Sequence, residues 1–189
     1  MKILILDNYD SFTYNLVHTI EKLITEKVDV FRNDEIALKN VAKYDKIVLS
    51  PGPGIPYEAG ILKQLIKEYS GTKSILGVCL GMQAIAEVFG CKLFNLENVF
   101  HGVATQMKII KNNEHLFAEI PLTFYAGRYH SWVVSKESFP ECLTITCEDT
   151  DGQIMGISHN ILDVKGVQFH PESVMTPLGE KIIYNWLNS

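Results

Sequence analysis

One cysteine of this chain stands in a setting that could make it a nucleophile. Cys79 lies in the segment from Gly77 to Gly81, after an apolar run and before a stretch with helical spacing. This pattern predicts a strand, a sharp turn and a helix, which together expose a nucleophile above a sheet. The free N–H groups at the start of such a helix favour the thiolate, the reactive form of cysteine. Most free cysteines are instead small core residues, and that interpretation holds for the other three, Cys91, Cys142 and Cys147.

A cysteine nucleophile needs a histidine that holds the ion pair and carries protons. Among the six histidines, His170 is selected because it follows residues 166–169, which are predicted to be a buried strand, and precedes Pro171. Glu172 lies two residues further along the chain. Its carboxylate could accept a hydrogen bond from one imidazole nitrogen while the other nitrogen faces the thiol. The sequence therefore predicts a catalytic triad of Cys79, His170 and Glu172.

A proline- and glycine-rich loop, from Pro51 to Gly54, follows a third apolar run. It lacks the lysine and Ser/Thr of a P-loop and the spacing of G-x-G-x-x-G. Its two prolines also remove amides that a phosphate nest would use. A plain turn and a rigid loop with a few oriented N–H groups both remain open. In the second case the amides of Gly52 and Leu80 could form an oxyanion hole.

The first half of the chain alternates strand-like and helix-like segments that would position these three sites. We expect strands at residues 2–6, 27–31, 46–50 and 74–78. We expect helices at residues 13–24, with Ser11 as N-cap, and at 58–69 and 83–89. Such alternation predicts a parallel sheet with helices on both faces. Ligands of such sheets bind beyond the carboxyl ends of the strands, where all three segments fall.

The second half has short strand-like segments separated by turns. They cover residues 104–110, 124–128, 132–135, 142–148 and 154–159, and Asp151-Gly152 looks like a hairpin turn. A last buried strand is expected at residues 165–169 and a closing helix at residues 178–187. The predicted fold class is therefore α/β, with an open, mostly parallel sheet covered on both faces and an antiparallel portion in the second half.

Length and composition predict one soluble domain spanning residues 1–189, with 47% hydrophobic and 21% charged residues. The net charge of −5 argues against a nucleic-acid partner, and the apolar runs are too short to span a bilayer. The start of the chain does not resemble a signal peptide, so we expect a cytoplasmic protein. The cysteines form no C-x-x-C pair, which disfavours a zinc ribbon.

Two motifs together resemble those of a known family, the class I (triad) glutamine amidotransferases. They run from Gly77 to Gln83 and from Gly166 to Ser173. The resemblance extends over essentially the whole chain and implies a flavodoxin-like sheet. Residues 7–13, 32–34, 101–102 and 128–131 are similar to those of the subunits that serve anthranilate synthase or the related aminodeoxychorismate (para-aminobenzoate) synthase.

The resemblance implies that Cys79 attacks the side-chain amide of L-glutamine, releasing glutamate and ammonia, with His170 and Glu172 as partners. It implies oxyanion amides from Gly52 and Leu80. The implied substrate contacts are Gly52, Pro53, Gly54, Gln83, Ser131 and Trp132. Trp132 departs from the leucine of the family, which matters little if backbone atoms bind the substrate. Met82 stands where histidine is also common.

The resemblance also implies a partner, a larger synthase subunit that receives the ammonia and acts on chorismate. Anthranilate is the first expectation for its product, and aminodeoxychorismate, or both, is the alternative. No cofactor and no metal are expected on this chain, and any magnesium would belong to the partner. Six residues are predicted at the interface with that subunit: Tyr9, Asp10, Ser11, Phe12, His101 and Gly102.

Two other functions remain open at this point. A cysteine peptidase on a similar scaffold would share the elbow and the histidine, but not the substrate contacts of Gln83, Ser131 and Trp132. A flavodoxin-like binding or regulatory module would instead bind flavin or a nucleotide.

Overall fold

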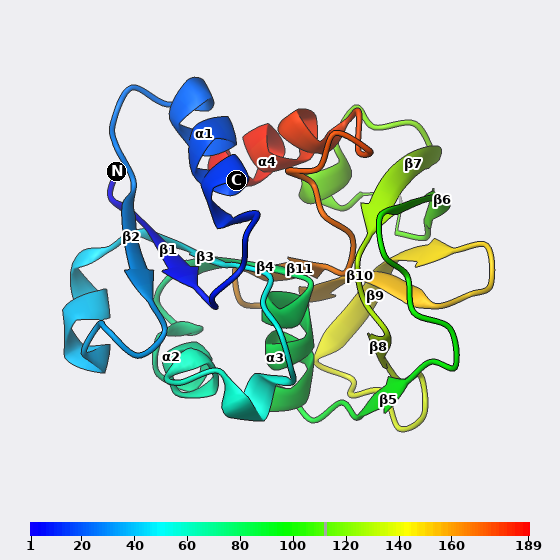
Figure 1. Cartoon of the computed structure of the whole chain (residues 1–189), viewed down its shortest axis with the longest axis horizontal. Coiled ribbons are helices and arrows are strands. Elements are labelled where there is room, and N and C mark those ends of the chain that lie inside the picture. The colour runs from blue at the N-terminus through cyan, green and yellow to red at the C-terminus, as the bar shows by residue number, and fades with distance from the viewer. Residues whose placement is uncertain (112) are drawn as a thin grey trace.

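The computed structural model describes residues 1–111 and 113–189, and a nine-stranded sheet runs through this part of the chain (Figure 1). The strand order is β2-β1-β3-β4-β11-β10-β9-β6-β7. The strands are β1 (Ile3–Asp7), β2 (Asp29–Arg32), β3 (Lys46–Leu49), β4 (Ser74–Val78), β6 (Val103–Ile109), β7 (Thr123–Arg128), β9 (Leu143–Asp149), β10 (Ile154–His159) and β11 (Val164–Val167). Two further strands, β5 (Leu93–Asn95) and β8 (Trp132–Val134), pair with each other.

The first five strands of this order are parallel to one another. Their order is that of a flavodoxin-like doubly wound sheet, in which β11 takes the fifth place. Strand β3 is buried at every position, as its apolar run predicts for a strand that is covered on both faces. The expected fold class is confirmed.

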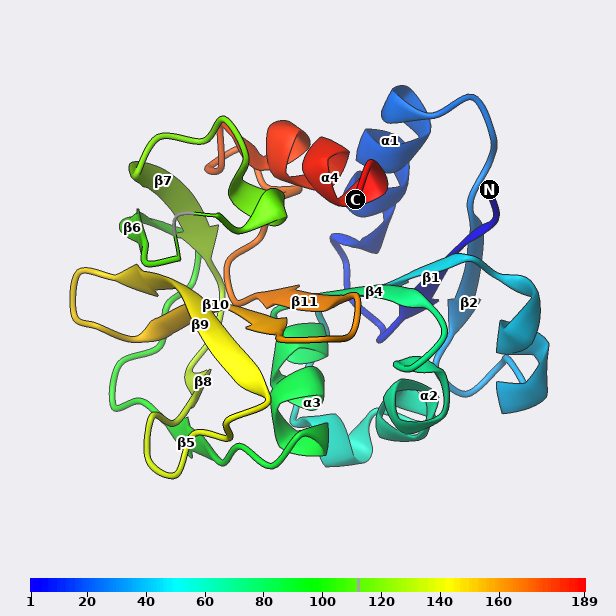
Figure 2. The same cartoon turned by 180° about the vertical axis from the view of Figure 1, so that it is seen from behind.

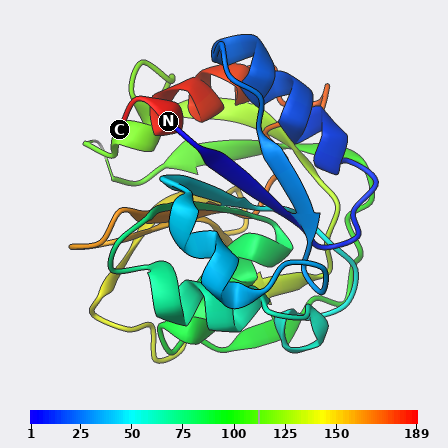
Figure 3. The same cartoon turned by 90° about the vertical axis from the view of Figure 1, so that its left-hand side faces the viewer.

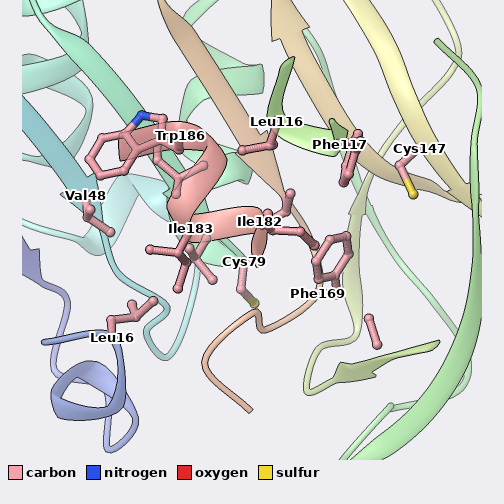
Figure 4. Packing of buried hydrophobic residues seen from close by; sticks show 14 of the residues in the cluster. Leu16, Val48, Cys79, Leu116, Phe117, Cys147, Phe169, Ile182, Ile183 and Trp186 are labelled. Atoms are coloured by element: carbon pink, nitrogen blue, oxygen red, sulfur yellow. The ribbon is translucent and has the colours of Figure 1, made fainter. Parts of the chain in front are cut away.

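Helices cover both faces of the parallel part. Helices α1 (Thr13–Leu23) and α4 (Gly179–Leu187) lie on one face, and α2 (Leu62–Tyr69) and α3 (Leu80–Val88) lie on the other (Figures 1 and 3). Each pair buries its own hydrophobic cluster against the sheet. In the first cluster, Ile182, Ile183 and Trp186 of α4 pack together with Phe169 and Cys79 (Figure 4). The site of the predicted nucleophile is therefore anchored in the core.

Strands β10, β9, β6 and β7 extend the sheet beyond β11 as an antiparallel ladder (Figure 2). The expected hairpin turn between β9 and β10 is present, and Gly152 has a φ of 75° there. Asp149 closes this turn, because its backbone N–H donates to the Gln153 carbonyl and its side chain accepts from two turn amides. The antiparallel portion thus follows the parallel one in a single continuous sheet.

Two local expectations are wrong. Phe12, not Ser11, is the N-cap of α1, and the Asp10 carboxylate accepts from the Phe12 amide at 2.8 Å. The helix expected at residues 58–69 is divided into a 3-10 turn at Pro56–Glu58 and α2, with Gly60 at a φ of 50° between them. No helix in the described part of the chain is long and apolar enough to cross a membrane.

Candidate active site

Cys79 occupies the sharp turn between β4 and α3. Its φ is 52° and its ψ is −103°, a backbone conformation that residues with a side chain rarely adopt. Its N–H donates to the Val167 carbonyl at 2.8 Å, and its own carbonyl accepts from the Gln83 amide at 3.0 Å. The turn is therefore tied both to β11 and to the first turn of α3.

The two glycines of the elbow are required by close backbone packing. A Cβ atom on Gly77 would lie 2.5 Å from the carbonyl carbon of Gly81. A Cβ atom on Gly81 would lie 2.4 Å from the Leu49 carbonyl oxygen on β3. No side chain fits at either position without moving backbone atoms. The strand, turn and helix predicted around Cys79 are all present.

His170 and Glu172 follow β11 and form a buried pair. The His170 Nδ1 atom lies 2.7 Å from Glu172 Oε1, and both side chains are almost completely inaccessible to solvent. The His170 amide donates to the Gly127 carbonyl at 3.0 Å, which joins this segment to β7. Because Nδ1 is held by the carboxylate, Nε2 is the nitrogen left to face Cys79.

Burial lowers the pKa of His170, but interactions with Cys79 and Glu172 raise it more, and the resulting pKa is about 10. The nearby Cys79 sulfur raises this pKa, and Glu172 raises it through its hydrogen bond to Nδ1 and through charge, while Nε2 has no hydrogen-bond partner among the described residues. A pKa of about 10 keeps this imidazole protonated at neutral pH. A protonated histidine beside a cysteine favours the thiolate, the form in which a cysteine acts as a nucleophile.

Cys79 lines a cavity of about 290 Å³ that can accommodate a small polar molecule. The structure brings all the predicted substrate contacts to this cavity. Its walls are Gly52, Pro53, Gly54, Cys79, Gln83, Val99, Phe100, His101, Tyr129, His130, Ser131 and Trp132. The predicted oxyanion donors also lie at this end of the sheet. Leu80 begins α3, where an N–H has no acceptor within the helix, and the Gly52 N–H makes no hydrogen bond within the described residues.

A second cavity of about 490 Å³ reaches Cys79 and His170 from another side. Five of the six predicted interface residues line it, namely Tyr9, Asp10, Ser11, Phe12 and His101. Gly102 lines neither cavity, and its amide donates to the Arg128 carbonyl at 3.0 Å. Their role at an interface stays a prediction, but the cavity places most of them within reach of the predicted triad.

The side chain of Gln83 uses both of its N–H groups inside the protein. They donate to the Trp132 carbonyl at 2.9 Å and to Gln168 Oε1 at 3.2 Å. Only the Oε1 atom of Gln83 remains available to the cavity, so this side chain can accept from a ligand but cannot donate to one.

A buried cluster around Arg128 contacts the Ser131-Trp132 segment through His130. The sequence contains no signal for this cluster beyond the resemblance of residues 128–131. Arg128 and Asp149 form an ion pair at 2.6 Å with both side chains fully buried. The guanidinium of Arg128 also lies over the Phe100 ring, and its Nε donates to His130 Nε2 at 3.1 Å. Burial first, and then the positive charge of Arg128, lower the pKa of His130 to about 3, so this imidazole is neutral.

The chain is similar along nearly its whole length to several known proteins. A Bacillus subtilis protein named aminodeoxychorismate/anthranilate synthase component 2 is 42% identical over 189 residues, covering 99% of this chain and 96% of that protein. Anthranilate synthase component 2 of Pseudomonas aeruginosa is 43% identical over 192 residues, covering 98% and 94%. Aminodeoxychorismate synthase component 2 of Escherichia coli is 43% identical over 188 residues, covering 98% and 99%.

A solved structure has the same fold. A Thermoplasma acidophilum protein described as a GMP synthase subunit superimposes with a TM-score of 0.88 at 24% identity, covering 100% of this chain and 92% of that one. The sequence profile of the family named Glutamine amidotransferase class-I matches residues 4–189. This match, the identity to full-length relatives and the Cys79 elbow lead to one conclusion: the chain belongs to the class I glutamine amidotransferases.

Proposed function

We propose that this chain is the glutaminase subunit of a chorismate-using synthase, with Cys79, His170 and Glu172 as its catalytic triad. The observation that carries the proposal is the His170 imidazole, which is held by Glu172 at 2.7 Å and lines the same cavity as Cys79 on its strained elbow. The names of the relatives support both anthranilate synthase and aminodeoxychorismate synthase. Neither product is favoured over the other, and one chain could serve both.

In the first half-reaction the Cys79 thiolate attacks the side-chain carbonyl carbon of glutamine. The C=O electron pair moves to the oxygen, which accepts hydrogen bonds from the amides of Gly52 and Leu80. His170 Nε2 then gives its proton to the amide nitrogen, and the C–N bond breaks. Ammonia leaves, and the glutamyl group stays on Cys79 as a thioester.

In the second half-reaction the neutral His170 takes a proton from water, and the resulting hydroxide attacks the thioester carbonyl. The C–S bond breaks, which restores the thiolate and the imidazolium, and the γ-carboxylic acid that forms gives its proton to solvent and leaves as glutamate. Glu172 holds His170 by Nδ1 throughout, so that Nε2 points at the reacting atoms in both steps. The proposed reaction needs no cofactor or metal on this chain.

The α-amino group of the substrate glutamine is an ammonium group that can only donate hydrogen bonds, so we assign its recognition to acceptor atoms. The free Oε1 of Gln83 is one, as its N–H groups are already used. The Trp132 carbonyl already accepts from Gln83 and His130, whereas among the described residues the Ser131 carbonyl accepts only from the Leu96 amide. We therefore propose that Ser131, rather than Trp132, provides the second acceptor for the ammonium group.

The partner subunit is proposed to cover the second cavity. Tyr9 and Ser11 line this cavity and are exposed, and the rings of Phe12, Tyr129 and His170, which also line it, meet in tilted and edge-to-face contacts. A subunit seated there would close the solvent-exposed side of the triad. Ammonia released at Cys79 would then leave toward the partner and not into bulk water.

A reconstitution experiment tests the function. The chain is mixed in turn with the large subunit of an anthranilate synthase and of an aminodeoxychorismate synthase, and glutamate release and the chorismate-derived product are measured. We expect glutamate release that is lost in Cys79→Ser, while ammonium salts still support product formation by the large subunit. The productive partner identifies the product. Absence of glutamate release with both partners would contradict the proposal, and peptide hydrolysis or flavin binding would support the alternatives.

A further inference from the structure

One buried side chain contacts the Cys79 sulfur and has no role so far. The Gln168 Nε2 atom lies 3.4 Å from Cys79 Sγ, and Gln168 is completely inaccessible to solvent. Gln168 directly follows β11, two residues before His170, and the intervening Phe169 is buried in the core. The backbone N–H of Gln168 donates to the Met155 carbonyl at 3.0 Å, so the backbone of this segment is held by β10.

The direction of this hydrogen bond is set by a chain of partners that begins at Arg128. A guanidinium can only donate, so the His130 Nε2 atom that it contacts at 3.1 Å must accept. The neutral imidazole then carries its proton on Nδ1, which lies 3.1 Å from the Trp132 carbonyl oxygen and donates to it. The carbonyl can only accept, and it therefore requires a donor from its second neighbour as well.

That second neighbour is Gln83, whose Nε2 lies 2.9 Å from the Trp132 carbonyl oxygen. The same nitrogen lies 3.2 Å from Gln168, so the atom of Gln168 that faces it must be the acceptor Oε1. The amide of Gln168 is thereby oriented with its Nε2 toward the sulfur. Each group in the series leaves the next only one orientation, and the series ends with an N–H directed at Cys79.

We infer that Gln168 is a further catalytic residue, whose side-chain N–H stabilises the Cys79 thiolate and is held in that orientation by Gln83. The catalytic consequence rests on the proposed glutaminase function. The N–H would favour the thiolate before attack, lose most of its interaction when the sulfur becomes a neutral thioester, and regain it when the thiolate leaves. Gln168 and His170 would then share the negative charge of the resting sulfur.

The alkylation of Cys79 by iodoacetamide tests this inference without glutamine. The rate is measured from about pH 5 to about pH 10 by mass spectrometry of the Cys79 peptide, since only the thiolate reacts. The methionine of Gln168→Met has a similar length but no hydrogen-bond donor. In this variant we expect the midpoint of the curve of alkylation rate against pH to rise by about one pH unit, and alkylation below that midpoint to slow by about 10-fold. The exposed Gln64→Met on α2 should match the wild type.

The dependence on Gln83 is tested by a double-variant cycle. Gln83→Met should raise the midpoint by less than Gln168→Met does, because Gln168 remains but is no longer oriented. The double variant should match Gln168→Met alone, and two independent, additive shifts would overturn the role of Gln83. If Gln168→Met does not fold, Gln168→Glu removes the donor at nearly constant shape and should raise the midpoint at least as far.

A folded Gln168 variant with the wild-type alkylation midpoint would overturn the inference. Steady-state kinetics with the partner subunit give the second readout, in which kcat should fall by about 10-fold or more while KM for glutamine changes little. A changed midpoint in a chain that releases no glutamate with either partner would refute the proposed function and leave the contact between Gln168 and Cys79 intact. The two ideas can therefore fail separately.

Discussion

Glu172 holds the His170 imidazole across a single intervening residue, with 2.7 Å between its Oε1 and the Nδ1 of the ring. In Glu172→Gln the amide would remove the negative charge and could hold the wrong tautomer of the ring. We expect the pKa of His170 to fall and kcat for glutamine hydrolysis to drop by about 10²- to 10⁴-fold. Glu68→Gln on the exposed side of α2 is the control and should keep full activity. Equal activity of the two variants would show that Glu172 is not needed.

The glycines of the elbow should tolerate no side chain. Gly77→Ala and Gly81→Ala each place a Cβ within 2.6 Å of backbone atoms, and we expect each to lower the free energy of unfolding by about 2–4 kcal/mol. Gly71→Ala is the matched control, since its Cβ would meet nothing within 4 Å. Urea unfolding at neutral pH gives all three values. An elbow variant as stable as Gly71→Ala would contradict this close packing.

His130 should destabilise the protein in acid. Its pKa is lowered to about 3, below the usual value of 6.5, so the unfolded chain binds a proton more readily than the folded one. The stability conferred by the neutral ring is complete above about pH 6.5 and is lost as the pH falls toward 3. In His130→Asn, which keeps a donor for the Trp132 carbonyl, the loss of stability between pH 6.5 and pH 4.5 should shrink by roughly 1–2 kcal/mol. An unchanged pH profile would mean that His130 does not titrate in this way.

The buried ion pair of Arg128 and Asp149 should depend strongly on both partners. Asp149→Asn leaves a fully buried guanidinium without a counter-charge, although the amide oxygen can still accept from the turn amides. We expect a loss of about 3–5 kcal/mol in the free energy of unfolding. The partly exposed pair of Lys136 and Glu148 is the comparison, and Lys136→Met should cost no more than about 1 kcal/mol. Similar losses for the two variants would show that burial does not make the Arg128–Asp149 pair more important for stability than the partly exposed pair.

The four cysteines should differ in reactivity. Burial raises the pKa of Cys91 to about 12, and burial likewise raises the pKa of Cys147, so both are unreactive thiols at neutral pH. Limiting iodoacetamide at about pH 7 should therefore modify Cys79 before Cys91 and Cys147. Peptide mapping after partial alkylation measures the order. Faster labelling of Cys91 than of Cys79 would contradict the proposal that His170 activates Cys79.

The elements around the nucleophile could be predicted because local signals agree with the tertiary structure. Short apolar runs between turn residues become buried parallel strands, and β4 and β10 have the predicted bounds. The other predicted strands and helices are present with ends shifted by a few residues, except that the helix expected at residues 58–69 is divided. Local sequence signals were wrong where another side chain takes the role that the pattern gave to its neighbour. Ser11 was expected to cap α1, but Asp10 is the residue whose side chain accepts from an amide at the start of this helix, that of Phe12. Strand β5 was missed because it is short and largely exposed.

The site was less predictable than the fold because its polar network consists of long-range contacts. Gln168 reads as an ordinary residue at the end of a strand, and its partners Cys79 and Gln83 are separated from it by 89 and 85 residues. Arg128 and Asp149 likewise show no local pattern. The substrate contacts of Ser131 and Trp132 came from family resemblance alone. Only the three-dimensional arrangement shows that this polar network reaches the cavity lined by Cys79, Gln83, Ser131 and Trp132.

The backbone of Cys79 has a consequence for how this chain can evolve. At a φ of 52° and a ψ of −103° a glycine would be more relaxed than any residue with a side chain. The substitution that best suits the backbone is thus one that abolishes the nucleophile. Selection for higher stability of the folded protein and selection for catalytic turnover act in opposite directions at this position. A lineage freed from the need for ammonia would be expected to lose the cysteine early and gain stability by doing so.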